Sequence, residues 1–246
     1  MEGIHSEILK ELVTFEPNNK KIRLGNEKDG GYIILDKYEY DCFLSGGIGN
    51  NVTFEEDFIK KYPNIPNFLF DSTVDNPGNN NFNFIKKNIG DGKNSTTSLI
   101  EYDKDYDDIF IKLDIEGSEW EWINEFNNLF YKVKQIVFEA HGFFIDLLPS
   151  SQKFWANGLN DEDHNNRILN SLKILNKTHY LVHVHANNGG PMVNINNEVY
   201  PSFFELTYIR KEIKGLNKQN LPIEIDFITD INNKECDINI YPFFYK

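Results

Sequence analysis

The sequence predicts an α/β fold built on a mostly parallel, doubly wound sheet. Short apolar runs, several of them followed by a glycine or an acid, alternate along the chain with segments of helical periodicity. The clearest run, at residues 109–114, leads directly into a cluster of acids, a glycine and the start of a helix. Alternating strands and helices are typical of a parallel sheet covered on both faces. Ligands of such sheets bind beyond the carboxyl ends of the strands, so we look for a site there.

Periodicity and turn residues assign the elements in order. Strands are expected where apolar residues cluster between turn signals, at residues 32–35, 40–45, 68–71, 84–89, 108–114, 135–140, 180–184 and 203–209. Helices are expected where apolar residues recur every three or four positions, at residues 2–14, 52–62 and 161–176. A further helix should begin at Ser118, which forms a capping-box pattern with Glu121 three residues later.

Length and composition favour one packed domain. The 246 residues suit a single α/β core, and contents of 40% hydrophobic and 14% aromatic residues argue against a disordered chain. We expect one domain over residues 1–246, with an N-terminal extension at 1–40, a core at 41–210 and a C-terminal extension at 211–246. The part from residue 215 onward mixes short strand and turn signals.

The charge of the chain makes nucleic acid an unexpected partner. Lysine and arginine total 25 and aspartate and glutamate total 38, which gives a net charge of −13. Such a surface repels phosphate backbones. Cys42 and Cys236 lack the spacing of a metal site. The first residues do not resemble a secretion signal and no apolar run approaches a membrane span, so we expect a soluble, cytoplasmic protein without a membrane partner.

A glycine loop at residues 46–50 is the first candidate for cofactor binding. It joins a strand to a helix, where backbone without side chains can come close to a ligand. Asp71 ends the next strand, at about the 20-residue spacing of an acid that hydrogen-bonds ribose hydroxyls. Glu55 and Glu56 follow the loop in the first helical turns, where a pyrophosphate would otherwise bind. These acids favour a nucleoside cofactor without phosphate.

Five ordered segments resemble a single protein family. Residues 112–119 match the pattern K-x-D-I-E-G-x-E. The other similar segments are at residues 23–32, 43–57, 137–142 and 183–208. In all of them the chain resembles FkbM-type, S-adenosylmethionine-dependent methyltransferases. The resemblance implies a Rossmann-like class I methyltransferase fold, with a seven-stranded mixed sheet flanked by helices, and methyl transfer to oxygen.

The resemblance also implies where the cofactor binds. The candidate residues follow the strands at the expected crevice: Asp29, Gly46, Gly47, Gly49, Asn50, Asp71, Ser72, Ser98 and Asp114. Ser45 stands where many methyltransferases carry an acid, so Asp29 or another acid is expected to contact the methionine amine instead. Ser98 follows the third strand and is expected near the adenine.

Two residues are expected to act on the acceptor hydroxyl. Asp114 ends the fourth strand and His141 the fifth, so both should face the same crevice. The reaction requires alignment of the acceptor oxygen and removal of its proton, and a histidine can act as that base near neutral pH. A divalent cation is the alternative: Asp114, Glu139 and His141 could hold Mg²⁺ or, because of the histidine, Mn²⁺. A lone histidine or an ion-paired glutamate can also be purely structural.

The acceptor is expected to be a small hydroxylated molecule, either a sugar or a nucleotide-sugar. Glu116, His185, Asn187 and Glu205 are the candidates for hydrogen bonds to its hydroxyls, although residues 187–191 also read as an ordinary turn. Trp120, Trp155 or Phe143 could stack on it.

Two other functions remain open, and a third, a cap-type RNA methyltransferase, is disfavoured by the net charge of −13. An NAD-dependent sugar-modifying enzyme would need a phosphate-binding loop, which is poorly matched here, and commonly a Tyr-x-x-x-Lys pair; Tyr106 is followed four residues later by Phe110. A module that binds S-adenosylmethionine without turnover is the other alternative.

Overall fold

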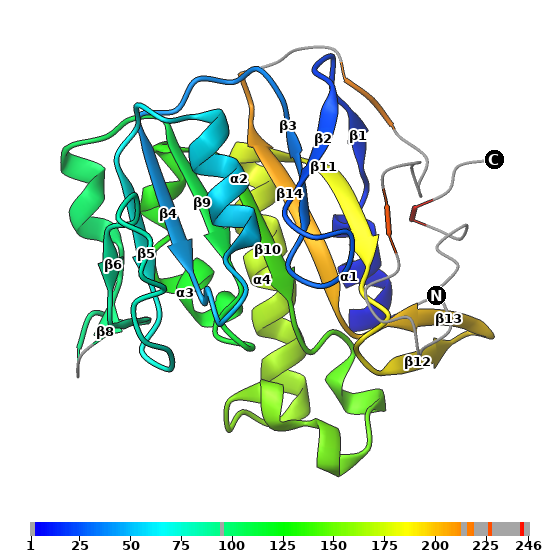
Figure 1. Cartoon of the computed structure of the whole chain (residues 1–246). Helices are drawn as coiled ribbons and strands as arrows, with labels where there is room; N and C mark the ends of the chain where they lie inside the picture. Colours follow the sequence, from blue (N-terminus) through cyan, green and yellow to red (C-terminus); the bar gives the residue numbers. More distant parts are fainter. Residues whose placement is uncertain (1–2, 94–95, 213–215, 219–225, 228–241, 244–246) are drawn as a thin grey trace.

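A seven-stranded mixed sheet forms the centre of the part of the chain that the structure describes (Figure 1). The structure is a computed structural model that describes residues 3–93, 96–212, 216–218, 226–227 and 242–243. In spatial order the strands are β11 (His179–Ala186), β14 (Phe204–Arg210), β10 (Val133–Ala140), β9 (Ile109–Leu113), β4 (Cys42–Gly46), β5 (Asn67–Phe70) and β6 (Phe84–Ile85). β14 is antiparallel to both of its neighbours, whereas the other neighbouring pairs are parallel. The predicted mixed α/β sheet is confirmed.

Helices cover both faces of this sheet. Figure 1 shows α2 (Thr53–Lys61) on the near face and α3 (Glu119–Glu125) and α4 (Asp161–Thr178) on the far face. α1 (Ile4–Glu11) packs against α4. α4 starts where Asn160 Oδ1 accepts a hydrogen bond from the Asp163 N–H at 2.9 Å, which satisfies a free donor of the first turn.

Shorter elements surround the central sheet. The two-stranded pairs are β1 (Phe15–Glu16) with β15 (Asn217–Lys218), β2 (Lys21–Leu24) with β3 (Tyr32–Leu35), β7 (Asn88–Ile89) with β8 (Thr96–Thr97), and β12 (Met192–Ile195) with β13 (Glu198–Pro201). Single 3₁₀ turns occupy Ile100–Lys104, Asn127–Tyr131, Ile145–Leu147, Ser150–Gln152 and Phe154–Ala156. The last three lie below the carboxyl ends of β4, β9 and β10 in Figure 1.

The core forms because the central strands are apolar on both faces. Every residue of β9 is buried, as a parallel strand between two layers of helices requires. Under α2, the rings of Phe43, Phe58 and Phe110 pack together, with centroids 4.2 Å apart for Phe43–Phe58 and 4.4 Å for Phe58–Phe110. The sheet thereby gives the loops at its carboxyl edge a rigid base.

Polar contacts attach the β2–β3 hairpin to the central sheet. The Leu35 N–H donates to Gln135 Oε1 at 2.8 Å, and Gln135 Nε2 donates to the Tyr40 hydroxyl. The Thr207 hydroxyl donates to Ile33 O at 2.6 Å. Gln135 is fully buried, so its amide replaces water for the groups that it contacts.

Two expectations about local structure are wrong. Residues 84–89 are not one strand, because a tight turn with a hydrogen bond from the Lys87 N–H to Ile85 O (2.7 Å) separates β6 from β7. Ser118 is the residue before α3 but has helical dihedral angles and makes no side-chain cap. Instead, Glu119 Oε1 accepts from the Ile115 N–H at 2.8 Å. The hairpin of β12 and β13 was not anticipated.

No helix among the described residues is long and apolar enough to cross a membrane. Most of the predicted C-terminal extension, including Cys236, lies outside the described residues. Cys42 is a buried free thiol on β4.

Replacing Gln135 by methionine should lower the free energy of unfolding by about 1–3 kcal/mol, because it leaves the buried Leu35 N–H and Tyr40 hydroxyl without their partner. Urea unfolding with an unchanged m value would measure the loss. Tyr40→Phe, which removes a single hydroxyl, is the control and should cost less, about 0.5–1.5 kcal/mol. A Gln135→Met variant as stable as the wild type would contradict the importance of this contact.

Candidate functional site

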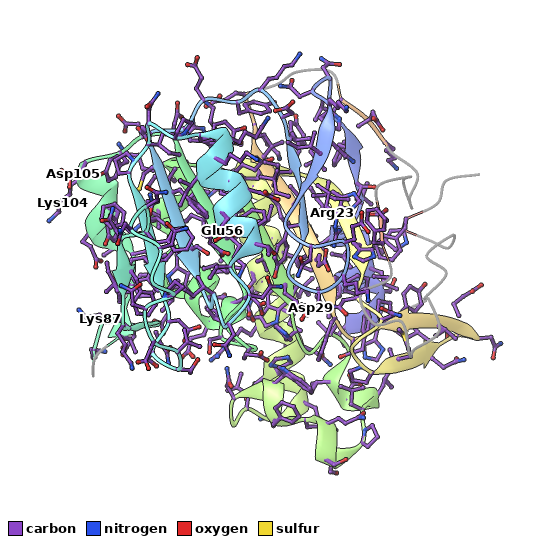
Figure 2. All side chains as sticks on the ribbon, in the orientation of Figure 1. Arg23, Asp29, Glu56, Lys87, Lys104 and Asp105 are labelled. Carbon is purple, nitrogen blue, oxygen red and sulfur yellow. The ribbon has the colours of Figure 1, made fainter. Side chains whose placement is uncertain are left out.

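Strand ends gather the candidate residues along one edge of the sheet. β4, β5, β9 and β10 are parallel, and the residues that follow them are Gly47, Asp71, Asp114 and His141. The antiparallel β14 begins at this edge, where Phe204 pairs with Ala140. Figure 2 shows Asp29 close to the same edge, whereas Lys104 lies away from it, at the left of the view. Residues from distant parts of the sequence can therefore act together.

The loop between β4 and α2 passes very close to the end of β9. Gly47 has a φ of 69°, and a Cβ at this position would lie 1.6 Å from Asp114 O. A glycine is therefore required. Gly49 has a φ of 53°, and an added Cβ would meet no atom within 4 Å. The backbone of Gly49 thus borders open space, as a ligand-binding loop requires.

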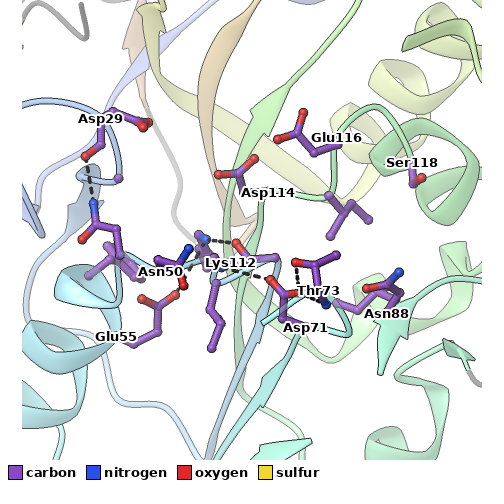
Figure 3. Close-up of a pocket in the computed structure, with 18 residues that line it drawn as sticks. Asp29, Asn50, Glu55, Asp71, Thr73, Asn88, Lys112, Asp114, Glu116 and Ser118 are labelled. Atoms are coloured by element: carbon purple, nitrogen blue, oxygen red, sulfur yellow. Dashed lines mark hydrogen bonds and ion pairs between the residues drawn. The ribbon is translucent and has the colours of Figure 1, made fainter. Parts of the chain in front are cut away.

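Asp71 connects the end of β5 to this loop (Figure 3). Its Oδ2 accepts from the Gly49 N–H at 3.0 Å, and its Oδ1 accepts from the N–H and hydroxyl of Thr73 at 2.7 and 2.6 Å. Burial alone would raise the pKa of the Asp71 carboxyl, but these hydrogen bonds outweigh it and lower the pKa. Asp71 is therefore ionised at neutral pH.

A buried charged cluster supports the loop from the sheet side. Lys112 Nζ donates to Gly47 O at 2.9 Å and lies 3.7 Å from Glu55 Oε1. Glu55 Oε1 also accepts from the Ser45 hydroxyl at 2.6 Å. The Lys112 and Glu55 side chains are only 5% and 1% exposed. This cluster joins β9, the loop and α2.

These elements enclose a first cavity of about 400 Å³. Its wall combines the glycine loop with the ends of β5 and β9. Its charged and glycine lining residues include Asp29, Gly47, Gly49, Glu55, Asp71, Lys112, Asp114 and Glu116. Thr73, Asn88, Asn50 and Ser118 also line it, as the close-up shows (Figure 3).

A second cavity of about 420 Å³ adjoins the first. Three acids line both cavities: Asp29, Asp114 and Glu116. The residues found only in the second cavity are Glu139, His141, Asn187, Gly189 and Phe203. The two spaces therefore meet beside Asp114.

Carboxylates surround His141. Its Nδ1 lies 3.3 Å from Glu119 Oε1, whereas its Nε2 lies 3.6 Å from Glu139 Oε1 and 3.8 Å from Glu116 Oε2. Burial alone would lower the pKa of His141, but Glu119, Glu139 and Asp114 outweigh it and raise the pKa to about 10. At pH 7 the protonated imidazolium therefore predominates.

Glu139 is an acid held among other acids. Burial and the charge of Asp114 raise its pKa well above the usual range, although His141 acts in the opposite direction. Asn187 Nδ2 donates to Glu139 Oε1 at 2.6 Å. Asp114, Glu139 and His141 each have a ligand atom that lies within 4.8 Å of the ligand atoms of the other two. This group has the composition of a divalent cation site.

His185 and Glu205 form a neighbouring pair on the sheet. Glu205 lies opposite Glu139 on one side and His185 on the other, and His185 Nδ1 is 3.2 Å from Glu205 Oε2. Burial lowers the pKa of His185, but Glu205 outweighs it and raises the pKa. Neither residue lines either cavity, so the pair flanks Glu139 from the side.

The loop before β3 brings Asp29 to the junction of the cavities. Arg23 holds this loop by donating to Asn26 O at 2.8 Å and to Lys28 O at 2.9 Å, and Asn51 Nδ2 donates to Asp29 O at 3.1 Å. Burial and the charge of Asp114 raise the pKa of Asp29.

Tyr32, at the start of β3, donates its hydroxyl to Asp114 Oδ2 at 3.3 Å. Burial and the charge of Asp114 raise its pKa well above the usual range, so the hydroxyl stays protonated. The β2–β3 hairpin therefore orients Asp114.

Aromatic side chains pack around His141, which lines the second cavity. Trp155 lies parallel to the His141 ring, with centroids 6.2 Å apart. Phe203 meets His141 and Trp155 edge-on at 4.8 and 4.6 Å. Trp120 and Phe143 are fully buried, so of the three predicted stacking residues only Trp155 lies beside the cavity lining.

The structure brings most, but not all, of the predicted site residues together. The predicted residues that line a cavity are Asp29, Gly47, Gly49, Asn50, Asp71, Asp114, Glu116, Glu139, His141 and Asn187. Gly46, Ser72 and Ser98 do not line either cavity; the Ser98 carbonyl accepts from Trp122 Nε1. The sequence pattern gave Lys112 no role at the site, used Glu55 only as an argument against a phosphate-bearing cofactor, and did not indicate Thr73 or Asn88. A lysine inside a buried apolar strand was the available signal for Lys112.

Comparison with known proteins identifies the family. The profile of the methyltransferase FkbM domain matches residues 3–168. No curated protein matched the sequence.

Solved structures with a similar chain path have low sequence identity. The fibrillarin/Nop5p complex aligns with 72% of this chain and 76% of its own, at 11% identity and a TM-score of 0.42. The plantazolicin methyltransferase BpumL, in complex with SAH, aligns over 71% and 77% at 15% identity and a TM-score of 0.39. The precorrin-6y C5,15-methyltransferase of Geobacter metallireducens aligns over 84% and 86% at 11% identity and a TM-score of 0.36.

The family profile covers two thirds of the chain and includes the glycine loop, Asp71, Asp114 and His141. The resemblance found in the sequence is thereby confirmed. The chain belongs to the methyltransferase FkbM domain family and is an S-adenosylmethionine-dependent methyltransferase.

Proposed function

We propose that the protein methylates a hydroxyl oxygen of a small polyhydroxyl acceptor, foremost an uncharged sugar. The observation that carries this proposal is the junction of the two cavities at Asp29, Asp114 and Glu116. A cofactor in the first cavity and an acceptor in the second would meet there. Methyl transfer requires that the two reactants be held in line, which adjoining cavities favour.

The first cavity fits a nucleoside cofactor that lacks phosphate. The bare backbone at Gly49 allows close approach, and the ionised Asp71 suits the hydroxyls of a ribose. Glu55 and Glu56 occupy the first turn of α2, where the pyrophosphate of NAD would require positive charge. When bound, S-adenosylmethionine supplies the methyl group on a positively charged sulfonium, which the nearby acids favour.

The second cavity favours an uncharged sugar over a nucleotide-sugar. A diphosphate would face the carboxyl groups of Asp29, Asp114, Glu116 and Glu139. Sugar hydroxyls, in contrast, donate hydrogen bonds to carboxylates. We propose Glu116 and Asn187 as contacts for the acceptor, with His185 and Glu205 acting only through Glu139.

Asp114 and His141 are proposed to organise the acceptor hydroxyl. Asp114 is oriented by Tyr32, and Glu119 holds Nδ1 of His141 so that Nε2 remains for the second cavity. In its neutral form His141 would take the hydroxyl proton at Nε2. Because its pKa is raised to about 10, only a small fraction of the protein carries this form at neutral pH.

The two alternative functions predict a different cofactor or no methyl transfer. An NAD-dependent sugar-modifying enzyme would bind NAD⁺ in the first cavity. A non-catalytic module would bind S-adenosylmethionine but transfer no methyl group to a panel of sugars, lipids and polyketides. Membership of the FkbM methyltransferase family favours the transferase, and the titratable groups of the second cavity beside the first support it.

Asp71→Ala should weaken binding of S-adenosylhomocysteine by about 10- to 100-fold, since a hydrogen bond to a charged group contributes about 1.5–3 kcal/mol. Isothermal titration calorimetry would measure the affinity, with NAD⁺ titrated in parallel. Asp75→Ala, which removes an exposed acid four residues later, is the control. Preferential binding of NAD⁺, or an unchanged affinity in Asp71→Ala, would contradict the proposed cofactor site.

If His141 is the base, kcat/KM should rise by about tenfold per pH unit between pH 7 and 9, because the neutral fraction rises by that factor below the raised pKa. The rate of transfer of a labelled methyl group to an acceptor found by sugar screening would measure it. His141→Gln should lower the rate by about 10²- to 10⁴-fold and flatten the profile. His5→Gln, at a solvent-accessible histidine, is the control. A flat wild-type profile would contradict the role of His141 as base.

A divalent cation on Asp114, Glu139 and His141 is the second way to activate the hydroxyl. In that case EDTA should abolish methyl transfer, and Mg²⁺ or Mn²⁺ should restore it. Binding of S-adenosylhomocysteine in the first cavity should remain within about twofold, because the proposed ligands of the cation belong mainly to the second cavity. Full activity in EDTA would overturn the cation and leave His141 as the proposed base.

A further inference from the structure

Glu55 has a carboxylate oxygen that no described residue satisfies. Its Oε1 accepts from the Ser45 hydroxyl, but its Oε2 is buried and has no hydrogen-bond partner within the described part of the chain. The whole residue is 0% exposed, yet it lines the first cavity. A buried charged oxygen without a donor is costly, so a cationic donor entering this cavity would gain from binding there.

Lys112 places a positive charge beside that oxygen. Among the described residues its Nζ makes one hydrogen bond, to Gly47 O, and the distance of 3.7 Å to Glu55 Oε1 is too long for a second. An ammonium group has three donors. Lys112 also lines the first cavity, so it can offer a donor to an anion there. In Figure 3 the Glu55 carboxylate extends from α2 toward Lys112, and Asp71 enters from the end of β5.

A buried carboxylate and a buried ammonium in one cavity match a zwitterion. Asp71 suits the ribose, which leaves Glu55 and Lys112 for another part of the same ligand. Ser45 carries no charge, and α2 supplies the acid at this place instead. Asp29, the acid first expected to bind the methionine amine, lies on a loop at the cavity mouth and keeps part of its surface in solvent, whereas Glu55 is fully buried.

We propose that Glu55 and Lys112 bind the amino-acid end of the cofactor, with Glu55 Oε2 accepting from its α-ammonium and Lys112 Nζ donating to its α-carboxylate. This inference rests on the proposed use of the first cavity for S-adenosylmethionine. It assigns the methionine amine to Glu55 rather than to Asp29.

Two ligands that differ only in the amine test the role of Glu55. S-adenosylhomocysteine carries the amine, and 5′-(3-carboxypropylthio)-5′-deoxyadenosine keeps the carboxylate but lacks the amine. Glu55→Gln should weaken the first by about 10- to 100-fold and the second by no more than about twofold, as calorimetry would measure. Glu162→Gln, which changes an exposed acid in the first turn of α4, is the control and should alter neither affinity.

A second variant, Lys112→Met, tests the same inference even if Glu55→Gln does not fold. Lys112→Met should weaken S-adenosylhomocysteine selectively over 5′-(3-aminopropylthio)-5′-deoxyadenosine, which lacks the carboxylate. Equal losses for both ligands of a pair, or no loss for either, would overturn the inference while leaving the proposed cofactor intact. Wild-type protein that binds none of the three compounds would overturn the proposed cofactor, and the inference with it.

Discussion

The close approach of Gly47 to the Asp114 carbonyl is the constraint on which the site depends. It leaves no room for a side chain, so the loop after β4 lies directly against the end of β9. Lys112 fixes the same junction from the sheet side through its bond to Gly47 O. Because of this contact, Asp114 belongs to the wall of both cavities. A looser junction would separate the space next to Asp71 from the space next to His141.

Charged side chains at this edge form two groups, one of paired opposite charges and one of crowded acids, and burying them costs different amounts of free energy. Around Glu55 and Lys112 opposite charges are buried together, which limits the cost of removing them from water. Around Glu139 several acids are crowded, and the protein accommodates them by raising pKa values and by holding His141 as a cation. The first arrangement suits a ligand that is itself dipolar, and the second suits proton transfer or a cation.

The sequence predicted the sheet and its edge better than the details of the site. Glycines and acids after apolar runs placed Gly47, Asp71 and Asp114 at one edge of the sheet, where the structure also has them, because parallel strands bring their carboxyl ends together. The sequence did not reveal the role of Lys112, because a lysine is buried only beside a partner, here Glu55, and that partner belongs to another element. The turn between β6 and β7 was also missed, because residues 84–89 contain no glycine or proline and only a local backbone hydrogen bond divides the two strands. Burial and pairing, unlike periodicity, are tertiary properties.

Between β11 and the antiparallel β14 the chain makes an excursion that lines the second cavity but not the first. β11 ends at the shared edge and β14 begins there, so the segment from Asn187 to Phe203, which includes the hairpin of β12 and β13, leaves the edge and returns to it. The Asn187 N–H donates to Phe203 O at 3.2 Å and the Ser202 N–H to Pro191 O at 2.8 Å, which closes the base of that excursion. Val193, Ile195 and Tyr200 of the hairpin pack into the core, whereas its tip at Asn196 and Asn197 is exposed and can change without shifting Asn187 or Phe203. Descendants of this chain can therefore vary the segment that contributes Asn187, Gly189 and Phe203 to the second cavity while every residue that lines the first cavity stays unchanged.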